Sequence, residues 1–247
     1  FIIKEFEKLI EYGVYTIKIT DERFLLNPKY YKPLCENLSK KNKDDKFKIW
    51  AYSRIDTVKR PEVLELVRKA GIKWLCLGIE SGDKKVRLEV AKGKFEDVDV
   101  RTVVKKIHEA DIDVLGNYIF GLPGDNIQTM QKTLDLSKEL CTSGWNAYAA
   151  MALPGSQLYK DAVDRKIKLP DTYEGYSFHA YNTVPLPTDE LPAYKILEFR
   201  DKAYIEYHSA KPFQERIKKR FGQKAVESIN DMLKIKLKRK IIEENKI

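Results

Sequence analysis

The feature that most constrains the fold is a regular alternation of short apolar stretches with stretches of helical spacing. Between Val14 and Arg165 this alternation has a period of roughly 25–35 residues. Strands are expected at 14–20, 47–53, 74–82, 113–125 and 145–156. Helices are expected at 3–12, 27–41, 60–70, 84–90, 98–110, 127–140 and 157–165. Such alternation predicts an α/β fold with parallel strands and right-handed crossovers, either a (β/α) barrel or an open doubly wound sheet.

The stretch from Trp74 to Gly82, WLCLGIESG, is the clearest of these strands. It is a short apolar run that ends in a carboxylate, a hydroxyl and a glycine, which favours a buried strand over a helix. Glu80 and Ser81 are then expected at the carboxyl end of the strand. In α/β folds ligands bind at that edge of the sheet, so Glu80 is a candidate for the floor of a site.

Polar or glycine-containing segments follow all five predicted strands. They are Asp21 with Glu22, Arg54 with Asp56, Glu80 with Ser81, the turn at 121–124 and the turn at 154–156. Carboxylates accept hydrogen bonds from ribose hydroxyls or an ammonium group, and an arginine pairs with a carboxylate through two bonds. These ends predict a site for a zwitterionic or nucleoside-like ligand. The alternatives are that Asp21 caps a turn, that Arg54 and Asp56 form a local ion pair, and that Asp125 caps a helix.

Several common kinds of site are not indicated. The segment GLPGD lacks the lysine of a phosphate-binding P-loop and the spacing of a dinucleotide-binding loop. The histidines show no metal-ligand spacing, and no metal ligand is predicted. Cys35, Cys76 and Cys141 are far apart and form no CxxC pair. We therefore expect three small buried side chains in a reducing, cytoplasmic compartment.

The last third of the chain has a different character. Residues 169–192 are rich in Tyr, Pro and Asp without periodicity, which predicts a long loop. Helices are expected from about Thr188 to Ser209 and from Pro212. A final amphipathic helix is expected from Lys224, with its apolar positions running to Ile241. Residues 211–247 hold twelve Lys or Arg against five Asp or Glu, so +7 of the net charge of +9 lies there.

Three ordered motifs resemble the radical S-adenosylmethionine (SAM) superfamily. They are GIESG at 78–82, YIFGLPGD at 118–125 and ALPGSQLY at 152–159. The resemblance covers residues 1 to about 166 and is closest to the subgroup that carries a cobalamin-binding domain ahead of the barrel. The segments YSFHAYNTVPLPT and FRDKAY also resemble the tail of members from cell-surface polysaccharide biosynthesis.

This resemblance implies a partial (β/α)6 TIM-like barrel with SAM lying across the carboxyl ends of the strands. It assigns no catalytic residue, but it implies a contact to SAM for each matching strand end. The implied contacts are Asp21 or Glu22 to the methionine amino group, Arg54 to the carboxylate, Glu80 and Ser81 to the ribose or amino-acid part, the backbone of Tyr118, Ile119, Phe120 and Gly121 to adenine, and Pro154 with Gly155 at the adenine edge. Asn117 stands where the family often has glycine.

The chain departs from the family in one respect. The CxxxCxxC loop that binds a [4Fe-4S] cluster is absent, and the three cysteines do not replace it. We therefore expect a fragment that begins just downstream of that loop and is inactive in SAM cleavage by itself. Its expected parts are a barrel domain at 1–168, a Tyr/Pro-rich loop at 169–192 and a helical basic extension at 193–247.

The function implied by the resemblance is radical or methyl-transfer chemistry with SAM and a cluster held upstream, and it leaves the use of cobalamin open. The implied partners are a small-molecule or sugar or lipid-precursor substrate and a reductant such as flavodoxin or ferredoxin. No membrane span is expected, and nucleic acid is not an expected partner. Two alternatives remain: an ordinary (β/α) barrel enzyme with Glu80 as a base, and a non-catalytic scaffold or nucleic-acid-binding protein acting through its basic tail.

Overall fold

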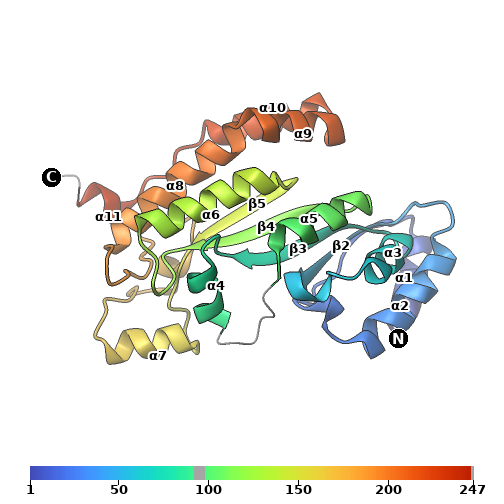
Figure 1. The fold of residues 1–247 in the computed structure, drawn as a ribbon, viewed down its shortest axis with the longest axis horizontal. Coiled ribbons are helices and arrows are strands. Elements are labelled where there is room, and N and C mark those ends of the chain that lie inside the picture. The colour runs from blue at the N-terminus through green and yellow to red at the C-terminus, as the bar shows by residue number, and fades with distance from the viewer. Residues whose placement is uncertain (92–97, 246–247) are drawn as a thin grey trace. The chain divides into compact units, whose positions relative to one another are not determined.

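The structure, a computed structural model, describes residues 1–91 and 98–245. Its sheet contains five strands in chain order, which are β1 (Thr16–Lys18), β2 (Lys48–Arg54), β3 (Ile72–Glu80), β4 (Asp113–Phe120) and β5 (Gly144–Ala149). The helices are α1 (Ile2–Glu11), α2 (Pro28–Lys41), α3 (Pro61–Lys69), α4 (Lys84–Ala91), α5 (Val100–Glu109), α6 (Ile127–Leu140), α7 (Gln157–Asp164), α8 (Ala193–Ser209), α9 (Lys211–Phe221), α10 (Gln223–Leu233) and α11 (Lys240–Glu243) (Figure 1). The predicted fold class, an α/β partial barrel of parallel strands with a helical C-terminal region, is confirmed.

The chain packs as two compact units. Unit 1 comprises residues 1–79, 98–117 and 142–144 of the described chain, and unit 2 comprises residues 80–91, 118–141 and 145–245. The predicted division into parts at 1–168, 169–192 and 193–247 remains a prediction.

In unit 1, β2 pairs in parallel with both β1 and β3, and Arg54 lies opposite Gly78. Buried Ile49, Ala51 and Ser53 alternate along β2 with residues that are only partly buried, as expected of a strand with helices on one face. The helix predicted after Asn27 begins where expected, because the Asn27 side chain accepts a hydrogen bond from the Lys29 amide at 3.0 Å.

In unit 2, the chain after β5 continues beside β4, since the Ala150 amide donates to the Phe120 carbonyl at 2.8 Å. Helix α8 lies alongside α6 and α10 (Figure 1). The buried ring of Trp145 on β5 stacks on Tyr207 of α8, and their ring centroids are 5.1 Å apart. The Arg200 side chain also donates to the Ala147 carbonyl at 2.8 Å. Helix α8 is therefore fixed to β5 by both an aromatic contact and a hydrogen bond.

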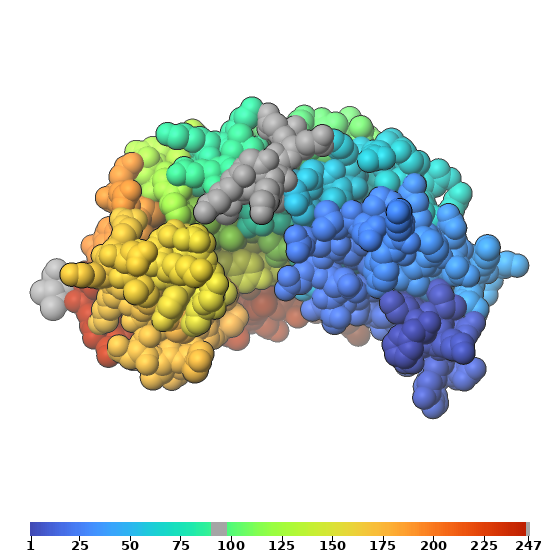
Figure 2. Space-filling model, turned by 90° about the horizontal axis from the view of Figure 1, so that it is seen from below, coloured from blue at the N-terminus to red at the C-terminus, as the bar shows by residue number. Residues whose placement is uncertain are grey.

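Helix α7 and the chain after it form one patch of the surface of unit 2, seen in yellow in Figure 2. Ala152, Ala162 and Leu186 are buried beneath it, and the predicted long loop contributes the last of them. The loop at 169–192 therefore wraps an apolar cluster of its own unit and holds one short 3-10 helix at Tyr173–Tyr176.

The prediction of a single final helix from Lys224 to Ile241 is wrong. Helix α10 ends at Leu233, and α11 begins only at Lys240. The intervening residues 234–239 read KIKLKR, whose alternation has the period of an extended chain rather than of a helix. In addition, Arg239 turns inward and donates to the Asp201 carboxylate at 2.8 Å. The sequence also predicts that the helix expected at 84–90 is broken at Lys92 and Gly93, and these two residues lie outside the described residues.

Within the described part of the chain, no helix is both long enough and apolar enough to cross a membrane.

Two glycines of unit 1 give a matched test of the packing. Both have a left-handed backbone, with φ of +73° at Gly13 and +97° at Gly71, but only Gly71 lacks room for a side chain. A Cβ at Gly71 would overlap the Cβ of Phe47, whereas a Cβ at Gly13 would meet nothing within 4 Å. We expect Gly13→Ala to lower the free energy of unfolding by ~1 kcal/mol from backbone strain alone. Gly71→Ala should cost ~1–3 kcal/mol more because the core must also shift.

Urea denaturation of the two variants measures this difference. Equal losses would contradict the close approach of Gly71 to Phe47.

Candidate functional site

Glu80, the last residue of β3, has three properties that distinguish it from ordinary strand residues. Its backbone is left-handed, with φ of +65°, which is uncommon for a residue other than glycine. Its carboxylate is partly buried and forms no hydrogen bond or ion pair with any described residue. Burial raises the pKa of Glu80 from 4.5 to about 7, because the charged form is poorly solvated. Backbone strain and a carboxylate without a protein partner together mark Glu80 as a functional candidate.

The two residues after Glu80 are held firmly by α6. The Ser81 and Thr133 hydroxyls are 3.2 Å apart, and the Gly82 amide donates to the Thr133 hydroxyl at 2.9 Å. The Ser81 hydroxyl also accepts from the Asp83 amide at 3.1 Å. Because Ser81 is fully buried and its hydroxyl is engaged, the structure gives it a role in fixing the strand end. Its predicted contact to a ligand stays a prediction.

The turn after β4 is organised by Asp125. The Asp125 carboxylate accepts from the amides of Gly121 and Leu122 at 3.1 and 3.0 Å, and from the Thr129 hydroxyl at 2.6 Å. Burial raises the pKa of Asp125, while these hydrogen bonds oppose the shift. The helix cap of α6 is the next residue, Asn126. Asp125 therefore fixes the shape of the Gly-Leu-Pro-Gly turn and does not cap the helix.

The side chains before this turn alternate between two surroundings. Tyr118 and Phe120 are fully buried, and both rings lie near Trp145 at centroid distances of 6.1 and 6.4 Å. Ile119 packs instead against the cluster that contains Val86. Gly121 has φ of +78°, and a Cβ there would come within 2.6 Å of Ile196 on α8. The glycine is thus explained by its turn and by the closeness of α8.

The turn after β5 is open. Pro154 and Gly155 are exposed, and a Cβ at Gly155 would meet nothing within 4 Å. Ser156 begins α7, because its hydroxyl accepts from the Tyr159 amide at 3.1 Å. This turn therefore leaves backbone groups accessible.

The remaining predicted site residues belong to unit 1. Asp21 and Glu22 are exposed in a turn after β1. The Arg54 guanidinium makes two hydrogen bonds to Asp56, from Nε at 3.0 Å and from Nη2 at 2.6 Å. The local ion pair considered from the sequence is therefore present. The contacts of Asp21, Glu22 and Arg54 to a ligand stay predictions.

The cysteines do not fit an iron–sulfur cluster. Cys35 is completely buried, and burial raises its pKa to about 12, which disfavours the thiolate. Cys76 is buried too, and its Sγ accepts a hydrogen bond from the side-chain Nδ2 of Asn117 at 3.0 Å. Cys141 is the C-terminal cap residue of α6, and its backbone has the left-handed conformation. Across residues 1–91 and 98–245, no three His, Cys, Asp or Glu side chains are grouped so that they could hold a metal.

Sequence reasoning missed Thr133, which holds the end of β3. Thr133 is buried on α6, three residues after Met130 and one before Leu134. Its position on the apolar face of the helix could therefore be recognised from the sequence. A polar residue on an apolar face signals a buried hydrogen bond. Its partners, however, lie 51 and 52 residues away in the chain and could not be named.

The chain is similar to a family model and to several known proteins. A family model described as "Radical SAM superfamily" matches residues 1–137. The anaerobic magnesium-protoporphyrin IX monomethyl ester cyclase of Cereibacter sphaeroides is 28% identical over 189 residues, which cover 74% of this chain and 29% of the relative. An uncharacterized methyltransferase of Pyrococcus horikoshii is 23% identical over 200 residues, covering 80% of this chain and 42% of the relative.

A solved structure shares the fold. It is the radical S-adenosylmethionine methyltransferase TsrM from Kitasatospora setae with cobalamin and a [4Fe-4S] cluster bound, with a TM-score of 0.59 and 18% identity over 68% of this chain and 34% of that one. The chain thus spans less than half the length of the two curated relatives and of TsrM.

The raised pKa of Glu80 predicts a pH-dependent effect on stability. Between pH 4.5 and about 7 the unfolded chain loses the Glu80 proton while the folded chain keeps it, so folding stability falls as pH rises. Glu80→Gln removes this loss. The variant should match the wild type at pH 4 and exceed it by ~2 kcal/mol above pH 7, after allowance for partial exposure.

Urea unfolding of both proteins across this pH range is the measurement. Glu227→Gln, at an exposed position of α10, removes a charge in the same way and should show no such gain. A Glu80→Gln difference that does not change with pH would contradict the assignment of a desolvated carboxylate.

Proposed function

Because this chain belongs to the radical SAM superfamily, we propose that it binds SAM and serves a methyl-transfer reaction. The binding residues in this proposal lie at the ends of β3, β4 and β5. The relative from Pyrococcus horikoshii, an uncharacterized protein named a methyltransferase, supports methyl transfer. When bound, SAM supplies a transferable methyl group or a 5′-deoxyadenosyl group.

The observation that carries this proposal is the free carboxylate of Glu80. A partly buried acid without a partner is costly, since it loses hydration and gains no protein hydrogen bond. A ligand that donates to it removes this cost. The ribose hydroxyls and the ammonium group of SAM are donors of the required kind. We assign to Glu80 the binding of one of these groups.

The other strand ends provide backbone groups for the adenosine part. Asp125 holds the Gly121–Gly124 turn in one shape through two amide hydrogen bonds, so this turn is prepared before a ligand arrives. Pro154 and Gly155 are exposed and offer backbone carbonyl and amide groups at the end of β5. The buried rings of Tyr118 and Phe120 hold the end of β4 in place.

The iron–sulfur cluster has no place among the cysteines of this chain, and no step of the proposal is assigned to it here. In a radical SAM enzyme its ligands would have to come from residues other than Cys35, Cys76 and Cys141. The use of cobalamin belongs to the same proposal about the whole protein and is supported by the fold shared with TsrM, whose structure holds cobalamin. The proposal also includes a reductant such as flavodoxin or ferredoxin.

A second candidate function follows from the pKa of Glu80. A carboxyl group that titrates near pH 7 suits general base catalysis in an ordinary (β/α) barrel enzyme. This candidate requires no SAM. The two functions differ in whether SAM binds and in whether Glu80 affects that binding.

The proposal predicts that Glu80→Ala weakens SAM binding by roughly tenfold or more, because a hydrogen bond to a charged group contributes ~1.5–3 kcal/mol. Isothermal titration of the protein with SAM measures the dissociation constant. Thr129→Val, which removes a hydroxyl that supports Asp125, should change the affinity less than Glu80→Ala does.

Circular dichroism on each variant establishes that the fold is kept. SAM affinity that is unchanged in a folded Glu80→Ala protein would overturn the assignment. The second candidate would be favoured if the wild-type protein binds no SAM and if a SAM-independent activity of the wild type is lost in the Glu80→Gln variant.

A further inference from the structure

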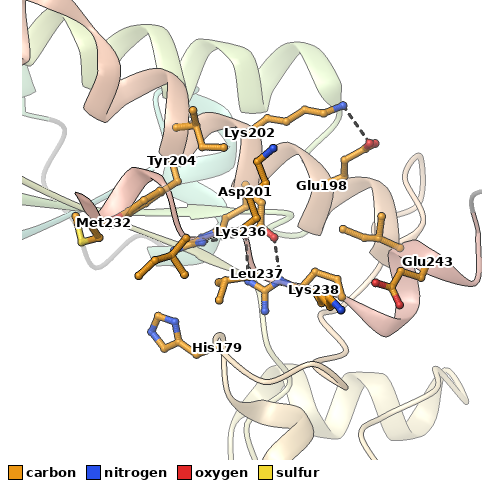
Figure 3. A pocket seen from close by; sticks show the side chains of 15 residues that line it. His179, Glu198, Asp201, Lys202, Tyr204, Met232, Lys236, Leu237, Lys238 and Glu243 are labelled. Atoms are coloured by element: carbon orange, nitrogen blue, oxygen red, sulfur yellow. Dashed lines mark hydrogen bonds and ion pairs between the residues drawn. The ribbon is translucent and has the colours of Figure 1, made fainter. Parts of the chain in front are cut away.

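Unit 2 contains a groove between α8 and the chain from Met232 to Glu243 (Figure 3). We call it the tail groove. Its volume is about 650 Å³, which lies within the ~300–1,000 Å³ typical of small-molecule sites. None of the residues assigned above to SAM binding lines it. The tail groove therefore needs an explanation of its own.

The groove exposes a set of aliphatic side chains. Ile205, Met232, Ile235 and Leu237 line it and are each between 40% and 69% exposed. Single exposed aliphatic residues are ordinary, but four that gather in one concavity indicate a binding surface. Their burial by a ligand would be favourable, because it removes apolar area from water.

The charges of the groove are unbalanced in favour of cations. Five lysine or arginine side chains line it against three carboxylates. All three carboxylates already have partners. Glu198 pairs with Lys202 at 3.0 Å, and Asp201 pairs with Arg200 at 2.9 Å and with Arg239 at 2.8 Å. Glu243 accepts a hydrogen bond from the Tyr181 hydroxyl at 2.8 Å. Lys236 and Lys238, in contrast, form no ion pair with any of the residues that the structure describes.

The wall that carries these two lysines is held by Arg239. Its side chain is 2% exposed and binds Asp201 through Nε and Nη2 at 2.8 and 3.1 Å. Its Nη1 donates to the carbonyls of Phe178 and Ala180 at 2.6 and 3.1 Å. Arg239 thus fixes the extended segment 234–239 against α8. A wall fixed in advance loses little conformational entropy when a ligand binds.

The two ends of the tail groove differ in chemistry. Figure 3 shows Met232 at one end of the labelled side chains, Lys236 and Leu237 next to each other in the middle, then Lys238, and Glu243 at the far end. This order matches a molecule whose apolar chain lies on the Met232 side and whose negative charge lies over Lys236 and Lys238, since the Glu243 carboxylate beyond them is bound by the Tyr181 hydroxyl. Lysine ammonium groups bind phosphate and carboxylate as point charges.

We propose that the tail groove binds a single-chain amphiphile, an aliphatic chain that carries one phosphate or carboxylate head group. The chain lies on Met232, Ile235 and Leu237, and the head group binds Lys236 and Lys238. The concave shape fits one such molecule better than the flat surface of a bilayer. This site is independent of the proposed SAM site, so either proposal can fail without the other.

Isothermal titration of the protein with dodecyl phosphate, kept below its micelle concentration, tests the proposal. Dodecyl phosphate should bind, and the double variant Lys236→Gln/Lys238→Gln should weaken binding by roughly tenfold through the loss of two charge contacts. Leu237→Ser should weaken it severalfold through lost apolar contact. The control Lys218→Gln/Lys219→Gln removes two exposed lysines of α9, outside the groove, and should leave binding within about twofold.

Three further probes separate the contributions. Inorganic phosphate alone and dodecyl maltoside should each bind much more weakly than dodecyl phosphate. Equal binding of inorganic phosphate would show that the apolar wall takes no part, and equal binding of dodecyl maltoside would show that the charge takes no part. Either result overturns the proposal. It is also overturned if the control variant loses as much affinity as the groove variant, or if anionic vesicles bind and monomeric dodecyl phosphate does not.

Discussion

The close packing of the Ser81–Gly82 backbone on helix α6 determines where β3 ends. A Cβ on Gly82 would lie 2.8 Å from the Thr133 Cα and would overlap the Lys132 carbonyl, so only glycine allows this approach. Thr133 then holds the backbone with a hydrogen bond from the Gly82 amide. The strand cannot continue past this point, and Glu80 adopts a left-handed backbone immediately before it. The strain at Glu80 is therefore maintained by contacts of its neighbours.

The same arrangement explains the electrostatics of the strand end. The polar groups next to Glu80 are committed to one another, since Ser81 binds Thr133 and Asp83, and the Ser81 carbonyl accepts from Arg87 at 2.9 Å. The Glu80 carboxylate receives none of these bonds, and burial alone raises its pKa. A rigid frame around one carboxylate that has no protein partner suits the binding of a hydrogen-bond donor. Membership of the radical SAM superfamily identifies SAM as the ligand to test first.

Local signals in the sequence predicted the elements well. Asn27 and Pro28 locate the start of α2, and the apolar spacing of 127–140 gives the bounds of α6, because caps and periodicity act over a few residues. Glu80 was also identified, because a charged residue that follows a buried strand can be recognised from the sequence alone. The bonds of Thr133 and of Arg239 were not, because their partners are tens of residues away. The tail helix was misjudged because KIKLKR carries an extended alternation within an otherwise helical region.

The central claim is that the Glu80 carboxylate is kept free for a ligand. The most direct measurement is a carbon-13 NMR titration of the Glu80 side chain, assigned with Glu80→Gln, with and without SAM. The account predicts a pKa near 7 in the free protein and a lower value when SAM is bound, because a donor to the carboxylate favours its charged form. Titration at the ordinary value of 4.5 in both states would contradict it.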